Sequence, residues 1–237
     1  DLWLYARLND DGLIPEFSTQ NNVTLKPIQV NIAAPFKVSE LTTDRKDYLP
    51  GSVVTVTGRI ESLIEGGLRN QQVNVTIEGN GQSLKSYPAT VDGATGMFTA
   101  YLDVNASAAG MMTIKARAIG QTEPDMQTQV NVWNMSLTAD NYTWTMDEGY
   151  PRQGQFTLRN LSGKTLTGLT IEHGTLPYGL KLNDDDVLRL QTTTLAAGES
   201  TVINYTANPS VASNTGGYTT FTVTARSKQG AEAIITL

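Results

Sequence analysis

Four consecutive oxygen-bearing side chains, at residues 183–186, are the most conspicuous chemical feature of the sequence. Hard cations such as Ca²⁺ bind oxygen ligands, which makes Asp184 and Asp186 the candidate ligands of a Ca²⁺ site. The alternation with glycine that marks an EF-hand loop is missing, and adjacent side chains cannot all face one ion. We therefore favour a solvated acidic turn over a metal site, and we expect no other cofactor.

The only histidine, His173, lies in the sequence Ile171-Glu172-His173-Gly174, just after an apolar strand. Acid–base or metal chemistry would need a nucleophile, a carboxylate or further ligands to converge on it, and no such motif lies beside it. The segment Gly79-Asn80-Gly81 lacks the lysine and the helix of a phosphate-binding loop. We predict that His173 is a loop or rim residue and that the chain is not an enzyme.

Aromatic side chains concentrate around residue 140, where the sequence carries Trp133, Tyr142, Trp144 and Tyr150. A flat, exposed row of such rings could stack on the faces of sugars and bind a glycan. Alternatively, Trp133 and Trp144 fix a junction between domains or belong to a core, and this is the interpretation that we favour. Exposure of both tryptophans on one open face would discriminate between the two.

Composition limits the classes of partner. The 237 residues carry a formal net charge of −6, which gives no general attraction for nucleic acid or anionic lipid. No apolar run is long enough to span a bilayer, so we expect no direct membrane insertion. The absence of cysteine excludes disulfides and thiolate metal sites, and it is compatible with an extracellular, cell-surface or periplasmic location.

Alternation of apolar and polar residues with a period of two recurs along almost the whole chain, as expected for strands with one buried face. The 32 threonines suit sheet surfaces better than helices. The apolar stripes include Val73/Val75/Ile77, Phe98/Ala100/Leu102/Val104, Phe156/Leu158, Thr201/Ile203/Tyr205 and Phe221/Val223/Ala225. Turn signals separate these stripes at the spacing of a β-sandwich.

Two stronger breaks, near Pro35 and near Trp133-Asn134, divide the chain into segments 1–33, 34–133 and 134–237. The second and third segments have the length of one immunoglobulin-like sandwich each. The first is too short for a core of its own, and we expect a terminal hairpin of an upstream domain or strands added to the middle one. Asp44 and Asp47 could approach a cation between domains, but we predict a plain exposed edge for them.

The middle segment contains LTTDRKDYLPGSVVTVTG at 41–58, VDGATGMF at 91–98 and AGMMTIKA at 109–116. In this order the three stretches resemble bacterial Ig-like and macroglobulin-type domains over about residues 34–133. True macroglobulins carry a thioester built on cysteine, and that chemistry is absent from a chain without cysteine.

The last segment contains GQFTLRNLSG at 154–163, LAAGES at 195–200 and GYTTFTVTA at 217–225. These stretches resemble bacterial sandwich modules that accompany large surface proteins and glycoside hydrolases. LYARLNDDG at 4–12 resembles the final hairpin of the bacterial cell-adhesion-related domain, with Thr19 where that family usually carries an acid.

The fold expected is all-β, with tandem immunoglobulin-like β-sandwiches and an N-terminal β-hairpin segment. The chain starts without a methionine or a signal-like run and ends on an alternating stripe, so we expect a fragment of a larger protein. The expected function is a non-catalytic spacer and protein-interaction scaffold, with the other domains of the same polypeptide as partners and a protein or glycan as ligand. A carbohydrate-binding module of a glycoside hydrolase is the alternative.

Overall fold

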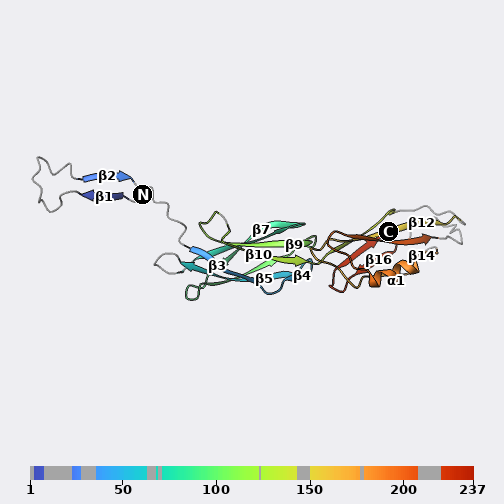
Figure 1. Cartoon of the computed structure of the whole chain (residues 1–237). Coiled ribbons are helices and arrows are strands. Elements are labelled where there is room, and N and C mark those ends of the chain that lie inside the picture. The colour runs from blue at the N-terminus through green and yellow to red at the C-terminus, as the bar shows by residue number, and fades with distance from the viewer. Residues whose placement is uncertain are drawn as a thin grey trace, which may run out of the picture. The chain divides into compact units, whose positions relative to one another are not determined.

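A computed structural model describes residues 3–7, 23–27, 36–62, 68, 71–122, 124–142, 150–176, 179–207 and 220–237 (Figure 1). The chain divides into two compact units, residues 1–35 and residues 36–237. In the first unit, strand β1 (Trp3–Arg7) pairs antiparallel with β2 (Val23–Pro27), from Trp3 opposite Pro27 to Arg7 opposite Val23. The expected N-terminal β-hairpin segment is confirmed, while residues 8–12 of the stretch LYARLNDDG lie outside the described residues.

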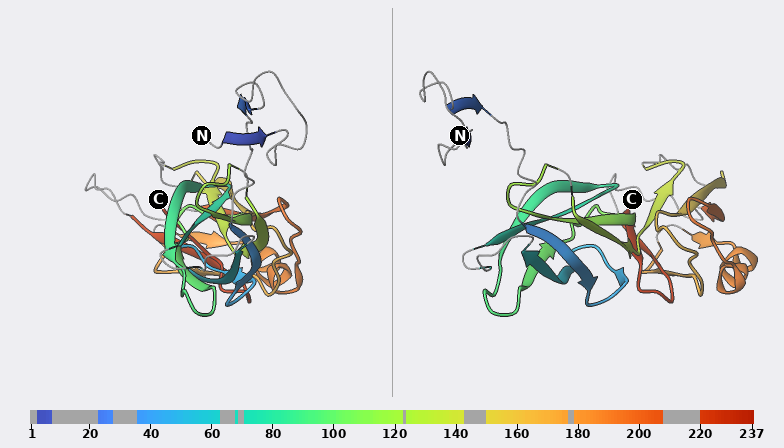
Figure 2. Two further views of the ribbon diagram at one scale, coloured as in Figure 1. Left: turned by 90° about the vertical axis from the view of Figure 1, so that its left-hand side faces the viewer. Right: turned by 60° about the vertical axis from the view of Figure 1, so that its left-hand side comes forward.

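The second unit begins with a sandwich of two sheets that face each other (Figures 1 and 2). One sheet has the order β3-β5-β8, with bounds Phe36–Thr43, Val53–Ser62 and Met97–Asp103. The other has the order β4-β10-β9-β6-β7, with bounds Asp47–Tyr48, Met126–Val132, Gly110–Ala118, Gln72–Gly79 and Gln82–Thr90. Strand β4 runs parallel to β10, whereas the other pairs are antiparallel. This is an immunoglobulin-like arrangement.

The core of the first sandwich consists of the apolar stripes that the sequence predicts. Val73, Val75 and Ile77 of β6 are fully buried, and Phe98, Ala100 and Leu102 of β8 face them from the opposite sheet. Alternate residues on both strands remain partly or fully exposed, because side chains of a strand point to the two faces in turn. The period-two prediction is therefore confirmed in this region.

A second sandwich follows with its own core. One sheet has the order β11-β12-β15-β14, with bounds Met135–Ala139, Arg152–Asn160, Ser200–Ala207 and Leu180–Leu182. The other has the order β13-β16-β17, with bounds Thr170–His173, Thr222–Arg226 and Glu232–Thr236. In chain order these strands follow the A-B-E-D and C-F-G sheets of a constant-type immunoglobulin domain. Phe156, Ile203 and Tyr205 lie at the centre of the core.

Helix α1 (Asp184–Thr192) occupies the acidic run, for which the sequence analysis favoured a turn. The turn prediction is wrong because Asn183 caps the helix: its side chain accepts a hydrogen bond from the Asp186 amide, and three aspartates fill the first turn. An asparagine N-cap followed by acids is a helix-start signal, since the acids interact favourably with the helix dipole. The helix lies beside β13 and β15 (orange in Figure 2).

Candidate functional site at the junction of the two sandwiches

A linker of only two residues, Trp133 and Asn134, joins β10 of the first sandwich to β11 of the second. The Trp133 amide donates to the Tyr48 carbonyl at 2.9 Å, and the Asn134 amide donates to Ser162 Oγ at 2.9 Å. The Asn134 carbonyl accepts from the Leu161 amide and from Ser162 Oγ, each at 3.0 Å. Hydrogen bonds to both sandwiches therefore fix the backbone of the linker.

The side chain of Asn134 also spans the junction. Its Nδ2 donates to the carbonyl of Ala108 in the first sandwich at 2.9 Å, while its Oδ1 accepts from the amide of Met135 in the second at 2.8 Å. One carboxamide thus supplies a donor to one sandwich and an acceptor to the other, which restricts rotation about the linker.

Asn131, at the end of β10, makes a second bridge and is fully buried. Its Nδ2 donates to Asp47 Oδ1 at 3.1 Å, and its Oδ1 accepts from the Gly163 amide of the second sandwich at 2.8 Å. Lys164 of the second sandwich donates from Nζ to the same Asp47 Oδ1 at 2.7 Å. The register of the parallel β4–β10 pair places Asp47 directly beside Asn131.

Hydrogen bonds within the second sandwich fix the loop that follows β12 and contacts the first sandwich. The buried side chain of Asn160 donates to the carbonyls of Lys164 and Leu195, each at 2.8 Å, and accepts from the Ser162 amide at 2.8 Å. In the part of the chain that the structure describes, no buried side-chain polar atom lacks a hydrogen-bond partner. The junction is therefore a satisfied polar network, which is the condition under which such a network adds rigidity.

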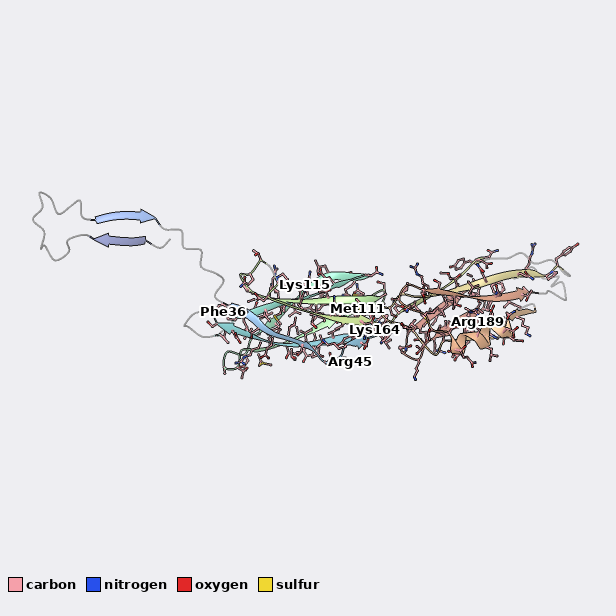
Figure 3. The ribbon with its side chains drawn as sticks, viewed as in Figure 1. Phe36, Arg45, Met111, Lys115, Lys164 and Arg189 are labelled. Carbon is pink, nitrogen blue, oxygen red and sulfur yellow. The ribbon has the colours of Figure 1, made fainter. Side chains whose placement is uncertain are left out.

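The loop of the second sandwich can approach the first sandwich closely because position 163 is a glycine. A Cβ added at Gly163 would lie 2.6 Å from Met111 Cγ and 3.0 Å from the Met111 amide nitrogen. Figure 3 shows Met111 and Lys164 where the two sandwiches meet. A side chain at position 163 would thus push the loop away from the first sandwich.

The predicted aromatic site is divided by the fold. Trp133 is half-buried at the junction, packs against the core of the second sandwich and has Lys164 Nζ 5.8 Å from its ring centroid. Tyr142 and Tyr150 are exposed, by 54% and 69%, and Trp144 lies outside the described residues. Trp133 precedes β11 and Tyr142 follows it, so the two residues lie at opposite ends of that strand. A glycan site stays a prediction.

The acidic candidates are engaged in structural contacts. Asp186 Oδ2 accepts from the amide of Asn204 at 2.9 Å and from its side chain at 2.7 Å, and Asp186 Oδ1 accepts from Arg189. The hydrogen bond from the Asn204 amide is the main cause that lowers the pKa of Asp186. Asp184 pairs with Lys181 at 2.6 Å. Among the described residues, no group of three or more histidine, aspartate or glutamate side chains could hold a metal ion.

Arg189 of α1 completes the same contact by donating to the Val202 carbonyl at 2.8 Å. Asp186 and Arg189 therefore satisfy backbone groups of β15 at Asn204 and Val202, where β12 pairs with one side of β15 and the described pairing with β14 on the other side has ended at Tyr205. Unpaired groups of this kind are templates for aggregation, and α1 covers them.

His173 is exposed, and its Nδ1 lies 2.8 Å from the Gly174 carbonyl oxygen. Asp44 and Asp47, predicted as an exposed edge, are both hydrogen-bonded: Asp44 to Tyr48 and Asp47 to Asn131 and Lys164. Asn131 and Lys164 were not predicted as junction residues, because a polar residue in an alternating strand, such as Asn131, indicates a solvent-facing position and a lysine in a loop indicates an exposed one. The nearest signal was the boundary placed at Trp133-Asn134.

Among the described residues, no helix has the length and the apolar character needed to cross a membrane.

No protein-family model and no curated protein matches the chain. Solved structures with a similar fold were found. The Yersinia pseudotuberculosis adhesin InvE is 14% identical with a TM-score of 0.34, over 85% of this chain and 59% of that one. Native Escherichia coli alpha-2-macroglobulin is 13% identical with a TM-score of 0.44, over 91% and 17%. The Escherichia coli adhesin FdeC is 14% identical with a TM-score of 0.36, over 84% and 64%. The chain spans less than two thirds of each. The strand orders and cores carry the fold assignment.

Proposed function

We propose that residues 36–237 act as a rigid, non-catalytic spacer and protein-interaction scaffold within a larger extracellular or periplasmic bacterial protein. The observation that carries this proposal is the junction, where a two-residue linker is combined with side chains that bridge both sandwiches. A flexible tether would instead need a longer linker with few contacts. The resemblance of the middle segment to bacterial Ig-like domains agrees with such a role.

The junction contacts are strong enough to restrict motion. Each satisfied, part-buried hydrogen bond contributes about 0.5–1.5 kcal/mol, and removal of one partner leaves the other unsatisfied at a cost of about 1–3 kcal/mol. Two such side-chain bonds run between the sandwiches: the Gly163 amide donates to Asn131 Oδ1, and Asn134 Nδ2 donates to the Ala108 carbonyl. Together they hold the relative orientation of the two sandwiches against thermal motion, so that a neighbouring domain is presented in a defined direction.

Its partners, on this proposal, are the other domains of the same polypeptide and a protein ligand. Binding would use exposed strands or loop ends, with modest affinity for one module and greater avidity for several.

The test measures the distribution of distances between the sandwiches. The chain has no native cysteine, so nitroxide labels can be placed uniquely at Gln127→Cys in β10 and Ile234→Cys in β17, both of which are exposed. Double electron–electron resonance should give one narrow distribution. An insertion of four Gly/Ser residues between Trp133 and Asn134 should widen it at least about twofold.

Two substitutions on the same strand refine this test. Asn131→Ala should broaden the distribution because it removes a buried bridge, whereas Gln129→Ala, at an exposed position of β10, should leave it unchanged. A distribution in the unaltered chain as wide as in the insertion variant would refute the rigid spacer.

One observation supports the carbohydrate-binding alternative: Tyr142 and Tyr150, which flank the segment 143–149 in the sequence, are both exposed. Its test is affinity electrophoresis in gels that contain soluble polysaccharides. Retardation that is lost in Tyr142→Ala and Tyr150→Ala would favour a glycan site, and unchanged mobility in every gel would refute it.

A further inference from the structure

The junction brings an amine, a carboxylate and a backbone amide around the side-chain carboxamide of Asn131. Asp47 Oδ1 accepts both from Asn131 Nδ2 at 3.1 Å and from Lys164 Nζ at 2.7 Å. Because these two distances add to 5.8 Å, the two nitrogen atoms can lie no farther apart than that. The amine of Lys164 and the amide nitrogen of the buried Asn131 side chain therefore meet at one carboxylate oxygen between the sandwiches.

Each member of this set has a defined chemical role. The Lys164 amine is a nucleophile once it has lost a proton, and the Asp47 carboxylate in contact with it is the base that can take that proton. The Gly163 amide donates to Asn131 Oδ1 at 2.8 Å, which polarises the carbonyl and would stabilise negative charge on its oxygen.

Burial favours the same chemistry. The Asn131 side chain is fully buried, so water has little access to its carbonyl carbon. The ring of Trp133, half-buried, lies on one side of Lys164, with 5.8 Å between Nζ and the ring centroid. A short linker and a fixed loop hold the amine and the amide in one place, which raises their effective concentration.

We propose that Lys164 and Asn131 form an intramolecular isopeptide bond that joins the two sandwiches covalently. Lys164 Nζ transfers a proton to Asp47 and attacks Asn131 Cγ, while the Gly163 amide holds the oxyanion. The Cγ–Nδ2 bond then breaks, and Asp47 relays protons to the departing nitrogen, which leaves as an ammonium ion. An amide between Nζ and Cγ remains, Asp47 is again a carboxylate, and no oxidant or other reactant is needed.

This arrangement is specific to the junction. Lys85, Lys115 and Lys181 also pair with carboxylates, those of Asp103, Glu78 and Asp184. Of the Lys–carboxylate pairs within the described ranges, Asp47–Lys164 is the one whose carboxylate also accepts from an asparagine side chain. Lys181 therefore offers a matched control, an exposed lysine with an aspartate partner and no amide beside it.

The test is the intact mass of the whole chain, followed by electrospray mass spectrometry until it stops changing. The cross-linked chain is lighter than the sequence mass by one ammonia, about 17 Da. Trypsin should release residues 118–152 joined to residues 160–181, because a linked Lys164 is no longer a cleavage site. Fragment ions must place the bond between Asn131 and Lys164.

Three variants separate this bond from other sources of the same mass. Lys164→Arg keeps the positive charge beside Asp47 but supplies no nucleophile, and Asp47→Asn removes the base, so both should show the full mass. Lys181→Arg should keep the loss. A succinimide at Asn80-Gly81 would give the same loss in Lys164→Arg, and peptide mapping would place it in another fragment.

A full sequence mass in the unaltered, folded chain overturns the proposal. A loss in Lys164→Arg that peptide mapping places at Asn131 overturns it as well. Either result leaves the non-covalent junction and the spacer function intact, because spin-label distances test those separately.

Discussion

Among the described residues, each sandwich buries one tyrosine whose hydroxyl donates to an aspartate, but the two pairs differ in their separation along the chain. Tyr48 donates to Asp44 Oδ1 at 2.7 Å, only four residues away, and also contacts the backbone of Arg45. Tyr205 donates to Asp140 Oδ1 at 2.9 Å, and these two residues are 65 positions apart. The same chemistry therefore closes a local turn in the first sandwich and ties distant strands together in the second.

Different parts of each sandwich are fixed by these pairs. The turn that Tyr48 closes precedes β4, which sets Asp47 beside Asn131 at the junction. Tyr205 lies over Gly154 and packs against Phe156, with ring centroids 4.8 Å apart, so it organises the core of the second sandwich. The comparison indicates that loss of Tyr48 should disturb the junction, whereas loss of Tyr205 should disturb a whole domain.

The largest effect is expected from Tyr205→Ala. Removal of a fully buried aromatic ring should lower the free energy of unfolding of the second sandwich by about 3–5 kcal/mol. Hydrogen exchange of the β12 and β15 amides at increasing urea concentration measures this. The β6 and β9 amides of the first sandwich serve as the control, and an equal loss of protection there would contradict separate cores.

Gly154→Ala tests the space that Tyr205 occupies. A Cβ at Gly154 would lie 2.2 Å from the Tyr205 hydroxyl oxygen, so the ring must move and weaken its contact with Asp140. Overpacking of this kind costs about 1–3 kcal/mol. We expect the double variant Gly154→Ala/Tyr205→Leu to be less destabilised than the sum of the two single variants, as double-mutant cycles on chemical denaturation would show.

Tyr48→Phe should have a smaller effect, about 1 kcal/mol, because Asp44 Oδ1 still accepts from the Thr55 amide. Burial and the hydrogen bond to Asp44 raise the pKa of Tyr48 from 10.0 to about 12. The folded chain thus favours the protonated hydroxyl, and this stabilisation is complete below the unfolded pKa and is lost as the pH rises toward 12. Ultraviolet titration of phenolate should show one fewer late-titrating tyrosine in Tyr48→Phe.

Burial and the hydrogen bond to Asp140 also raise the pKa of Tyr205, so Tyr205→Phe should remove a second late-titrating group. If neither variant changes the alkaline end of the titration, the two hydroxyls are not protected as the structure indicates.

Calcium should have the smallest effect of all. Both carboxylate oxygens of Asp186 already accept hydrogen bonds from Asn204 and Arg189, so millimolar Ca²⁺ should change the melting temperature by less than about 1 °C. Differential scanning fluorimetry with and without EDTA measures this. A clear upward shift that disappears in Asp184→Asn/Asp186→Asn would restore the Ca²⁺ site.

Much of the architecture followed from local pattern. Valines and isoleucines at alternate positions, such as Val73, Val75 and Ile77, can be buried together only on one face of a strand. The acidic run fits two local patterns, since consecutive acids are typical of a solvated turn, but an asparagine followed by acids is also a helix-start signal, and the chain adopts the helix.

The sequence by itself determined the strands and the two sandwich cores, because side-chain alternation and turn residues act over short distances along the chain. Only the tertiary structure decided what the junction is made of. Asn131 lies between Val130 and Val132 and follows the pattern of an exposed residue, until a loop 32 residues later covers it with Gly163 and Lys164. Contacts between residues so far apart depend on how two finished sandwiches meet, and no local pattern encodes that.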